Sequence, residues 1–171
     1  MGTCKMVGGL DPSLSNFGMA KGTAVNGKLT IDQITLVTTL VDSSTKYKNM
    51  DDLRRAKELG GVMMDFFEGI DTVYVEIPVG SQSARAMASY GICVGIIAAL
   101  GKRVVRVSAK DVKLIATDNP KALKRDMINW ATNKYPDLPW LTKKRKGELT
   151  YTNANEHVAD AIAALHVGVR E

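Results

Sequence analysis

Zinc-type cysteine spacing, a secretion signal and a membrane-length apolar run are all missing from this chain, and each absence excludes a class of protein. The two cysteines, Cys4 and Cys93, lie in apolar runs, where we expect small buried side chains in a reducing compartment. The apolar stretch over residues 5–10 is too short for a signal peptide. The longest apolar segment, residues 84–100, contains Arg85 and several polar or glycine residues, so we expect a core or interface helix and no membrane span.

Length and charge suggest a single domain with a polyanionic partner. A chain of 171 residues can bury a substantial core, and we expect one domain over residues 1–171. Residues 102–146 contain thirteen Lys or Arg and four Asp, a net charge of +9, whereas the whole chain carries +5. Such a basic tract favours nucleic acid as a partner. A solvated basic surface without a partner is the alternative that charge alone leaves open.

Hydrophobic periodicity predicts the element order β-β-β-α-β-α-β-α-α-α. Strands are expected over residues 5–10, 17–24, 28–40, 72–77 and 103–107, with a hairpin turn at Asn26-Gly27 and a bulge or long twist in the third strand. Helices are expected over residues 51–70, 83–100, 108–115 and 120–133, and a last one, with Asn153 and Glu156 as a capping box, ends near Val169. Residues 136–147 read as irregular. A hairpin-led sheet followed by βαβ units predicts an α/β fold, with a five-stranded mixed sheet flanked by helices.

Acidic residues stand at the ends of two predicted strands and near the start of the last helix. Asp11 ends the first strand and Glu76 ends the fourth, so parallel pairing of these strands would place both carboxylates at one edge of the sheet. His157 and Asp160 are three residues apart and share one side of the last helix. The alanines around them let that helix lie close to the sheet. Since Mg²⁺ prefers oxygen ligands and commonly works on phosphates, the pattern predicts a magnesium site that acts on nucleic acid.

Each of these residues also has a simpler interpretation. Asp11 precedes Pro12 and could be a turn residue. Asp160 could favour the positive end of its helix, and a lone histidine such as His157 is more often a satisfied surface or core residue than a ligand. Glu76 follows Val-Tyr-Val, where an unpaired buried carboxylate would be costly. The three elements together favour the metal site over these separate explanations.

In their order and spacing, these segments resemble the RuvC family of Holliday junction resolvases, in the RNase H-like superfamily. The resemblance covers essentially the whole chain and rests on three motifs: Gly-Leu-Asp-Pro-Ser-Leu-Ser-Asn-Phe-Gly at residues 9–18, Val-Tyr-Val-Glu ending at Glu76, and His-Val-Ala-Asp at residues 157–160. Residues 83–99 resemble the helix through which the family dimerises. Many family members carry Asp at the position of His157, and some carry His. Two positions depart from the family pattern, with Ser13 in place of a glycine and Val79 in place of an aromatic residue, so the chain is identified as a divergent member.

The resemblance implies a Mg²⁺-dependent DNA endonuclease that acts as a homodimer and resolves four-way junctions by paired nicks. Its catalytic and metal-binding residues would be Asp11, Glu76, His157 and Asp160, with two Mg²⁺ ions per site and Mn²⁺ as an expected substitute. The DNA backbone would be held by Lys113, Lys121, Lys124 and Arg125. The small residues of the helix over residues 83–100 are the expected dimer interface, and their internal packing on the sheet is the alternative. We expect a cytoplasmic protein (of the host cytoplasm if viral), or an organellar one.

Three other functions stay open at this point. The chain could be a less selective branch, flap or RNA–DNA hybrid nuclease, or a junction-binding module without catalysis. It could also be a fragment of an actin-like or sugar-kinase ATPase, because Gly-Leu-Asp-Pro-Ser resembles a phosphate loop of that fold as well. Those ATPases need two such domains, whereas this chain has room for one, and it lacks a Gly-x-x-x-x-Gly-Lys loop.

Overall fold

Three long antiparallel strands open the computed structural model, which describes residues 4–145 and 147–170. They are β1 (Cys4–Pro12), β2 (Asn16–Val25) and β3 (Lys28–Thr38). The predicted turn joins β2 and β3 through Asn26 and Gly27, whose φ angles are both positive, 51° and 77°. A register shift at Lys21/Gly22 lies where β2 pairs with the irregularly alternating β3, which confirms the expected bulge.

Two further strands extend the sheet on the other side of β1. These are β4 (Thr72–Glu76) and β5 (Arg103–Val107), and the order across the sheet is β3-β2-β1-β4-β5. β4 runs parallel to β1, and β5 runs parallel to β4. The expectation of a mixed five-stranded sheet is therefore confirmed, including the parallel pairing of the strands that end at Asp11 and Glu76.

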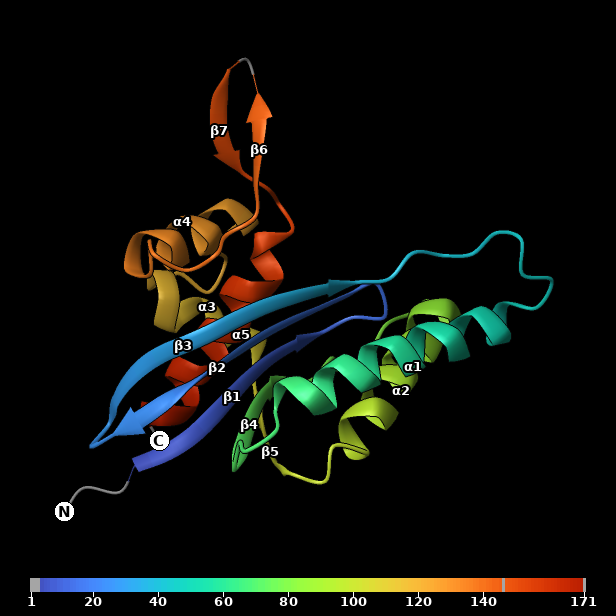
Figure 1. Cartoon of the computed structure of the whole chain (residues 1–171), viewed down its shortest axis with the longest axis horizontal. Helices are drawn as coiled ribbons and strands as arrows, with labels where there is room; N and C mark the ends of the chain where they lie inside the picture. The colour runs from blue at the N-terminus through green and yellow to red at the C-terminus, as the bar shows by residue number, and fades with distance from the viewer. Residues whose placement is uncertain (1–3, 146, 171) are drawn as a thin grey trace.

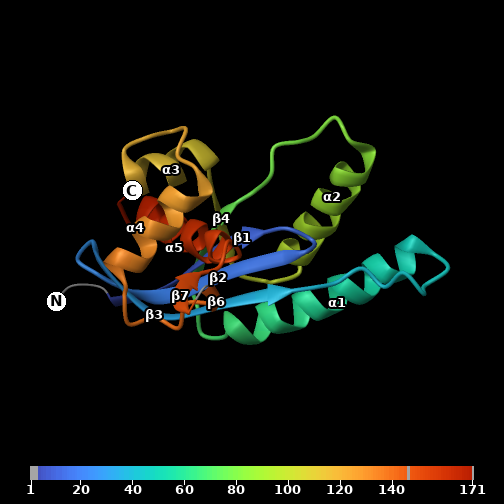
Figure 2. The same ribbon diagram turned by 90° about the horizontal axis from the view of Figure 1, so that it is seen from above.

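Helices cover both faces of this sheet in separate groups (Figure 2). On one face lie α1 (Lys48–Phe66) and α2 (Ala84–Ala98), which share a core with Leu10, Phe17 and Val75. On the other face lies α5 (Asn155–Arg170), with α3 (Ala109–Thr117) and α4 (Lys124–Lys134) packed outside it. The arrangement is a three-layered α/β fold of the RNase H-like kind.

Several predicted helix ends were displaced, and a local hydrogen bond explains one of them. α4 begins at Lys124 and not at Pro120, because the Asp126 carboxylate accepts a 2.9 Å hydrogen bond from the Leu123 N–H and so fixes the first turn there. The capping box predicted for α5 was wrong, since the Glu156 carboxylate instead pairs with Lys124 at 2.7 Å. Ser108 caps α3 as expected, accepting from the Asp111 N–H at 3.1 Å.

The segment expected to be irregular, residues 136–147, contains the first strand of a β-hairpin that projects from the body beside α4 (Figure 1). Its strands are β6 (Thr142–Arg145) and β7 (Glu148–Tyr151), and Gly147 lies in the turn with φ 87°. The run Lys-Lys-Arg has low strand propensity, so the local sequence gave no strand signal and cross-strand pairing decides the structure. The last residue of the basic run, Lys146, lies outside the described residues.

Two expectations about small side chains need correction. Cys93 is buried as predicted, whereas Cys4 is exposed. On α2, a Cβ added at Gly91 or Gly95 would meet no atom within 4 Å, so this side of the helix does not pack on the sheet. It borders instead an apolar surface groove between α1 and α2, which is lined by Ala56, Lys57, Gly60, Gly61, Met64, Ile92, Gly95, Ile96 and Ala99. Within the described residues, no helix has the length and apolar character needed to cross a membrane.

Candidate metal centre

Two carboxylates meet at the edge of the sheet because β1 and β4 are parallel neighbours. Leu10 pairs with Val75 in the register of these strands, so Asp11 and Glu76 follow side by side at their carboxyl ends. The chain leaves this edge through a tight turn in which the Ser13 hydroxyl lies 3.0 Å from both the carbonyl and the N–H of Asn16. Ser13 thus keeps the turn closed where the RuvC-family pattern has a glycine.

The start of α5 reaches this edge because two glycines on the strands leave room for its backbone. A Cβ at Gly9 would lie 2.0 Å from the carbonyl oxygen of Ala161, and one at Gly18 would lie 2.1 Å from that of His157. Any larger residue at either position would push the helix away. The predicted role of small residues on α5 is confirmed by the complete burial of Ala159. The sequence reading missed the matching glycines on the strands, although both stand inside the first motif.

His157 is hydrogen-bonded to Asp11 across this packed interface. The His157 Nδ1 lies 2.6 Å from the Asp11 Oδ2, and both side chains are largely shielded from solvent. The hydrogen bond to Asp11 raises the pKa of His157 above its usual value, against the opposing effect of burial. The imidazole therefore fixes the orientation of a carboxylate at the end of β1.

Asp160 lies one turn further along α5, in a half-buried position without the usual compensation for a carboxylate. Among the described residues, its Oδ1 has no hydrogen-bond partner. Burial, followed by the charges of Asp11 and Glu76, raises the pKa of Asp160 to about 8. Burial and the charge of Asp11 likewise raise the pKa of Glu76 to about 7. The three carboxylates are thus close enough to repel one another, and a cation among them would remove that repulsion.

The donor set fits Mg²⁺, although its side chains are not arranged as a closed ligand shell. Over residues 4–145 and 147–170, no three His, Cys, Asp or Glu side chains are placed to hold one ion in common. One of the Asp11 oxygens is engaged by His157, whereas Asp160 keeps a buried oxygen without a partner. Three carboxylates with such an orphaned oxygen are the hard oxygen ligands that Mg²⁺ requires.

Basic residues surround the carboxylates to differing degrees. The charge of Lys113 lowers the pKa values of Glu76 and Asp160, which places this partly buried lysine beside both. Lys124 is exposed and pairs with Glu156, the residue before His157, at 2.7 Å. Lys121 and Arg125 are exposed on the same segment, and neither has an ion pair among the described residues. The structure thus brings two of the four predicted basic residues next to the carboxylates.

A buried arginine network under the β1–β2 turn was not found from the sequence. The Arg55 guanidinium on α1 donates to the carbonyl of Leu14 at 3.0 Å and to the hydroxyls of Ser15 and Thr39 at 3.0 and 2.9 Å. It also lies 4.0 Å from the carboxylates of Asp51 and Asp52. In sequence, an arginine within an amphipathic helix looks like a solvated residue, and only the tertiary contacts show that it holds the turn that follows Asp11.

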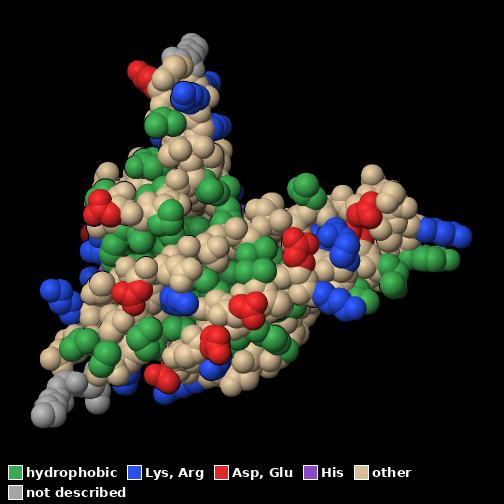
Figure 3. All heavy atoms as spheres, in the orientation of Figure 1, with side chains coloured by type: hydrophobic (Ala, Val, Ile, Leu, Met, Phe, Trp, Pro, Cys, Tyr) green, Lys and Arg blue, Asp and Glu red, His purple; other side chains and the backbone are tan. Residues whose placement is uncertain are grey.

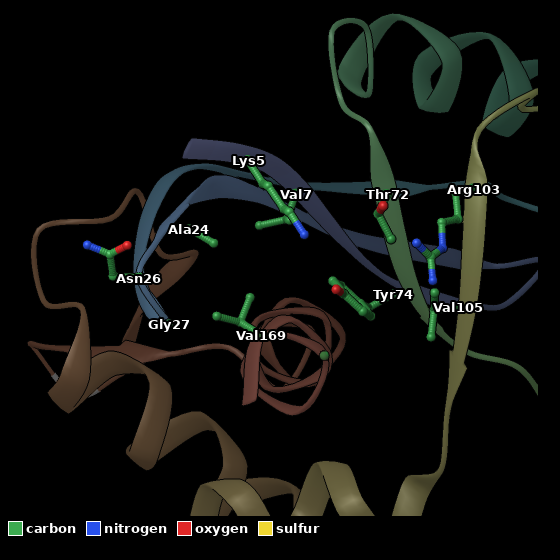
Figure 4. A pocket seen from close by; sticks show the side chains of 11 residues that line it. Lys5, Val7, Ala24, Asn26, Gly27, Thr72, Tyr74, Arg103, Val105 and Val169 are labelled. Carbon is green, nitrogen blue, oxygen red and sulfur yellow. The ribbon is translucent and has the colours of Figure 1, made fainter. Parts of the chain in front are cut away.

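A different cavity lies at the opposite end of the sheet and is separate from these carboxylates (Figure 4). It has a volume of about 410 Å³, and Lys5 and Arg103 stand at its rim. Its floor includes Tyr74, whose ring lies against Gly168 near the end of α5. Of the residues that the structure describes, no acidic one lines this cavity, and the candidate metal centre does not extend to it.

Comparison with solved structures shows the fold. T. thermophilus RuvC in complex with a Holliday junction substrate matches with a TM-score of 0.66 and 17% sequence identity, over 95% of this chain and 92% of that one. A second Thermus thermophilus RuvC structure matches with a TM-score of 0.64 and 18% identity, over the same shares of the two chains. No protein-family model and no curated protein sequence matches the chain. The fold is therefore RuvC-like, and the low identity makes the chain a divergent example of it.

Proposed function

We propose that this protein is a Mg²⁺-dependent endonuclease that cuts branched DNA, and four-way junctions in particular, by paired nicks. The observation that carries the proposal is the meeting of Asp11, Glu76 and Asp160 at one edge of a RuvC-like sheet, where burial and the neighbouring carboxylates raise the pKa values of Glu76 and Asp160. A purely structural cluster would need partners for these carboxylates, whereas Asp160 keeps an orphaned buried oxygen. The similar T. thermophilus RuvC has a Holliday junction as its bound substrate.

In this proposal, Asp11, Glu76 and Asp160 hold two Mg²⁺ ions, and His157 positions Asp11 through its Nδ1. Bound Mg²⁺ would activate water and stabilise the oxygen that leaves the phosphate. The nearby basic residues have two different proposed roles in binding DNA. Lys113 lies beside the carboxylates and would contact the phosphate that is cut, and Lys124, Lys121 and Arg125 would hold the adjoining backbone.

Paired nicks require two sites, and the open face of α1 and α2 is our proposed dimer interface. The groove there is almost entirely apolar, and its glycines allow two helices to approach closely. Met64, Met87 and Val94 are each more than 40% exposed on the same two helices. A symmetric dimer through this face would present two identical sites to opposed strands of a junction.

A less selective branch nuclease is the second candidate, and one residue favours it. Val79 occupies the position where the family pattern has an aromatic residue, and it is 86% exposed on the loop after β4. An aliphatic side chain offers no ring for stacking against bases at a junction centre. Cleavage of flaps at the rate of four-way junctions would support this second candidate.

A cleavage assay with a separate metal-binding measurement tests the proposal. Purified protein is incubated with labelled four-way junction, flap, duplex and RNA–DNA hybrid in a Mg²⁺ titration, and Mn²⁺ binding is followed calorimetrically without DNA. We expect junction nicking that Asp11→Asn and Glu76→Gln abolish, together with loss of Mn²⁺ binding and unchanged junction affinity. Wild-type turnover by either variant would remove the metal-site assignment. Junction binding without cleavage in either metal would leave only a binding module.

A further inference from the structure

The β6–β7 hairpin and α4 enclose a second basic groove that the proposed chemistry does not use. Its volume is about 360 Å³. Three cationic side chains line it: Arg125 from α4, and Lys143 and Arg145 from β6. No acidic residue lines it, and no ion pair within 4.0 Å is found for these three side chains in the described part of the chain. Blue side chains mark the hairpin where it projects at the top of Figure 3.

The alternation of side chains along β6 explains why the cations gather in this groove. Lys143 and Arg145 are two residues apart, so both point to the same face of the hairpin. On that face Thr150 lies opposite Lys143 and Glu148 lies opposite Arg145, although no ion pair within 4.0 Å joins Glu148 to Arg145 in the described part of the chain. The hairpin packs only lightly on the body, and its strands are exposed almost throughout. Burial of apolar core therefore does not account for this run of like charges, which repel one another unless an anion lies between them.

The other residues that line the groove indicate which class of ligand it would bind. Tyr151 and Leu149 also line the groove and are 45% and 69% exposed. They alternate with Thr150, so an aromatic ring and an aliphatic surface lie on the other face of the hairpin, at the edge of the groove. Phosphate-binding cations beside an exposed ring are the pattern by which proteins hold single-stranded nucleic acid.

The groove also adjoins the candidate metal centre. Arg125 follows Lys124, which pairs with Glu156 at the start of α5. Asn153, two residues before the first residue of α5, lines the groove as well. A strand that leaves the carboxylates past Lys124 would therefore enter the space between α4 and the hairpin.

We propose that the groove between α4 and the β6–β7 hairpin binds a single nucleic-acid strand, through phosphate contacts to Arg125, Lys143 and Arg145 and base stacking on Tyr151. The inference rests on the proposed nuclease function for the identity of the strand as one arm of the substrate, opened beside the cut. The binding itself does not depend on catalysis, because none of these residues belongs to the carboxylate cluster.

Fluorescence anisotropy with a labelled single-stranded oligonucleotide, in EDTA and at several salt concentrations, tests the groove. The double variant Lys143→Glu/Arg145→Glu is compared with Lys28→Glu/Lys102→Glu, which makes the same change in net charge at the opposite end of the sheet. We expect the groove variant to lose roughly tenfold or more in affinity, with a salt slope reduced by about 1.4, since each phosphate contact to a single strand contributes about 0.7. The control variant should lose less than threefold. Tyr151→Ala should lose roughly fivefold or more in affinity with an unchanged salt slope.

The outcomes separate this inference from the proposed function. Equal losses in the two charge variants, or unchanged affinity in the groove variant, would overturn the groove while leaving junction cleavage to stand on its own assay. A wild-type protein that cuts no branched DNA, but whose strand binding depends on Lys143, Arg145 and Tyr151, would support the groove and refute the nuclease. Circular dichroism checks that each variant remains folded.

Discussion

The His157 Nδ1 lies 2.6 Å from the Asp11 Oδ2, and this contact joins two residues that are 146 positions apart in the chain. It closes the start of α5 onto the end of β1. Because the imidazole occupies one carboxylate oxygen, it restricts how Asp11 can turn toward a cation. Groups that orient a metal ligand in this way commonly change metal affinity when they are removed.

Replacement of His157 by alanine should therefore weaken metal binding more than DNA binding. We expect His157→Ala to raise the Mg²⁺ concentration needed for half-maximal cleavage roughly 10–100-fold, since Asp11 loses its partner. His157→Asp is the matched variant, because Asp stands at this position in many RuvC-family members, and it should retain most of the activity. Mg²⁺ titrations of the cleavage rate and calorimetry with Mn²⁺ provide the measurement. An unchanged metal requirement in His157→Ala would show that the contact is only structural.

Removal of the Asp160 charge should stabilise the protein at alkaline pH while abolishing cleavage. The folded-state pKa of Asp160 is raised from 3.8 to about 8, so the folded chain binds more protons than the unfolded chain between these values, and stability falls as pH rises through this window. Glu76, raised from 4.5 to about 7, contributes in the same direction. In EDTA, Asp160→Asn should raise the melting temperature by several degrees at pH 8.5 and by little at pH 4.

The control for this pH effect is Asp65→Asn, a substitution of an exposed carboxylate on α1. Its melting temperature should follow the wild type at every pH. Added Mg²⁺ should stabilise the wild type at pH 8.5, because it offsets the repulsion among the carboxylates, and should leave Asp160→Asn almost unchanged. An Asp160→Asn variant that is less stable than the wild type at pH 8.5 would contradict the raised pKa.

Most of the fold could be read from the sequence because its signals are local. Three local patterns each predict the element in which they occur: the Asn26-Gly27 turn, the helical spacing in α1 and the β-branched residues of β4. The β6–β7 hairpin could not be predicted in this way, because Lys143 and Lys144 have low strand propensity and only pairing with β7 makes them a strand.

Only two features of the candidate site could be predicted from the sequence: the carboxylates at the ends of strands, and the spacing of residues along the last helix. Asp11 and Glu76 follow from parallel pairing, and Asp160 follows from its place one turn after His157. The close approach that brings these groups together depends on Gly9 and Gly18, and the clash that any side chain there would cause is visible only in three dimensions. For the same reason, Arg55 looked like a surface residue until its contacts were known.

Loss of the Arg55 guanidinium should destabilise the turn after Asp11 and the whole chain. Arg55→Met would remove one of the two donors to the Leu14 carbonyl, which keeps the Thr39 hydroxyl, and a second cation beside Asp51 and Asp52, which keep Arg54 and Arg85. Because several buried hydrogen bonds of the guanidinium are lost together, we expect a loss of about 3 kcal/mol in the free energy of unfolding. Arg54→Met is the matched variant on the exposed side of the same helix. Its ion pairs are partly solvated, and it should cost at most about 1 kcal/mol. Urea unfolding measures both, and equal losses would rule out a special role for Arg55.

A charge on the open face of α2 should separate the proposed dimer into monomers without unfolding the chain. A Cβ added at Gly95 meets no atom within 4 Å in the single chain, and replacement of a helical glycine also removes its entropic cost, so Gly95→Glu should not lower the melting temperature. In a dimer through this face, two glutamates would be forced into an apolar interface. Sedimentation should show a dimer for the wild type and for Asn133→Glu, a control on the exposed end of α4, and a monomer for Gly95→Glu.

The monomer should nick junctions on one strand at a time, because the second site is no longer held opposite the first. A Gly95→Glu protein that remains dimeric would place the interface elsewhere and leave the apolar groove between α1 and α2 without this role.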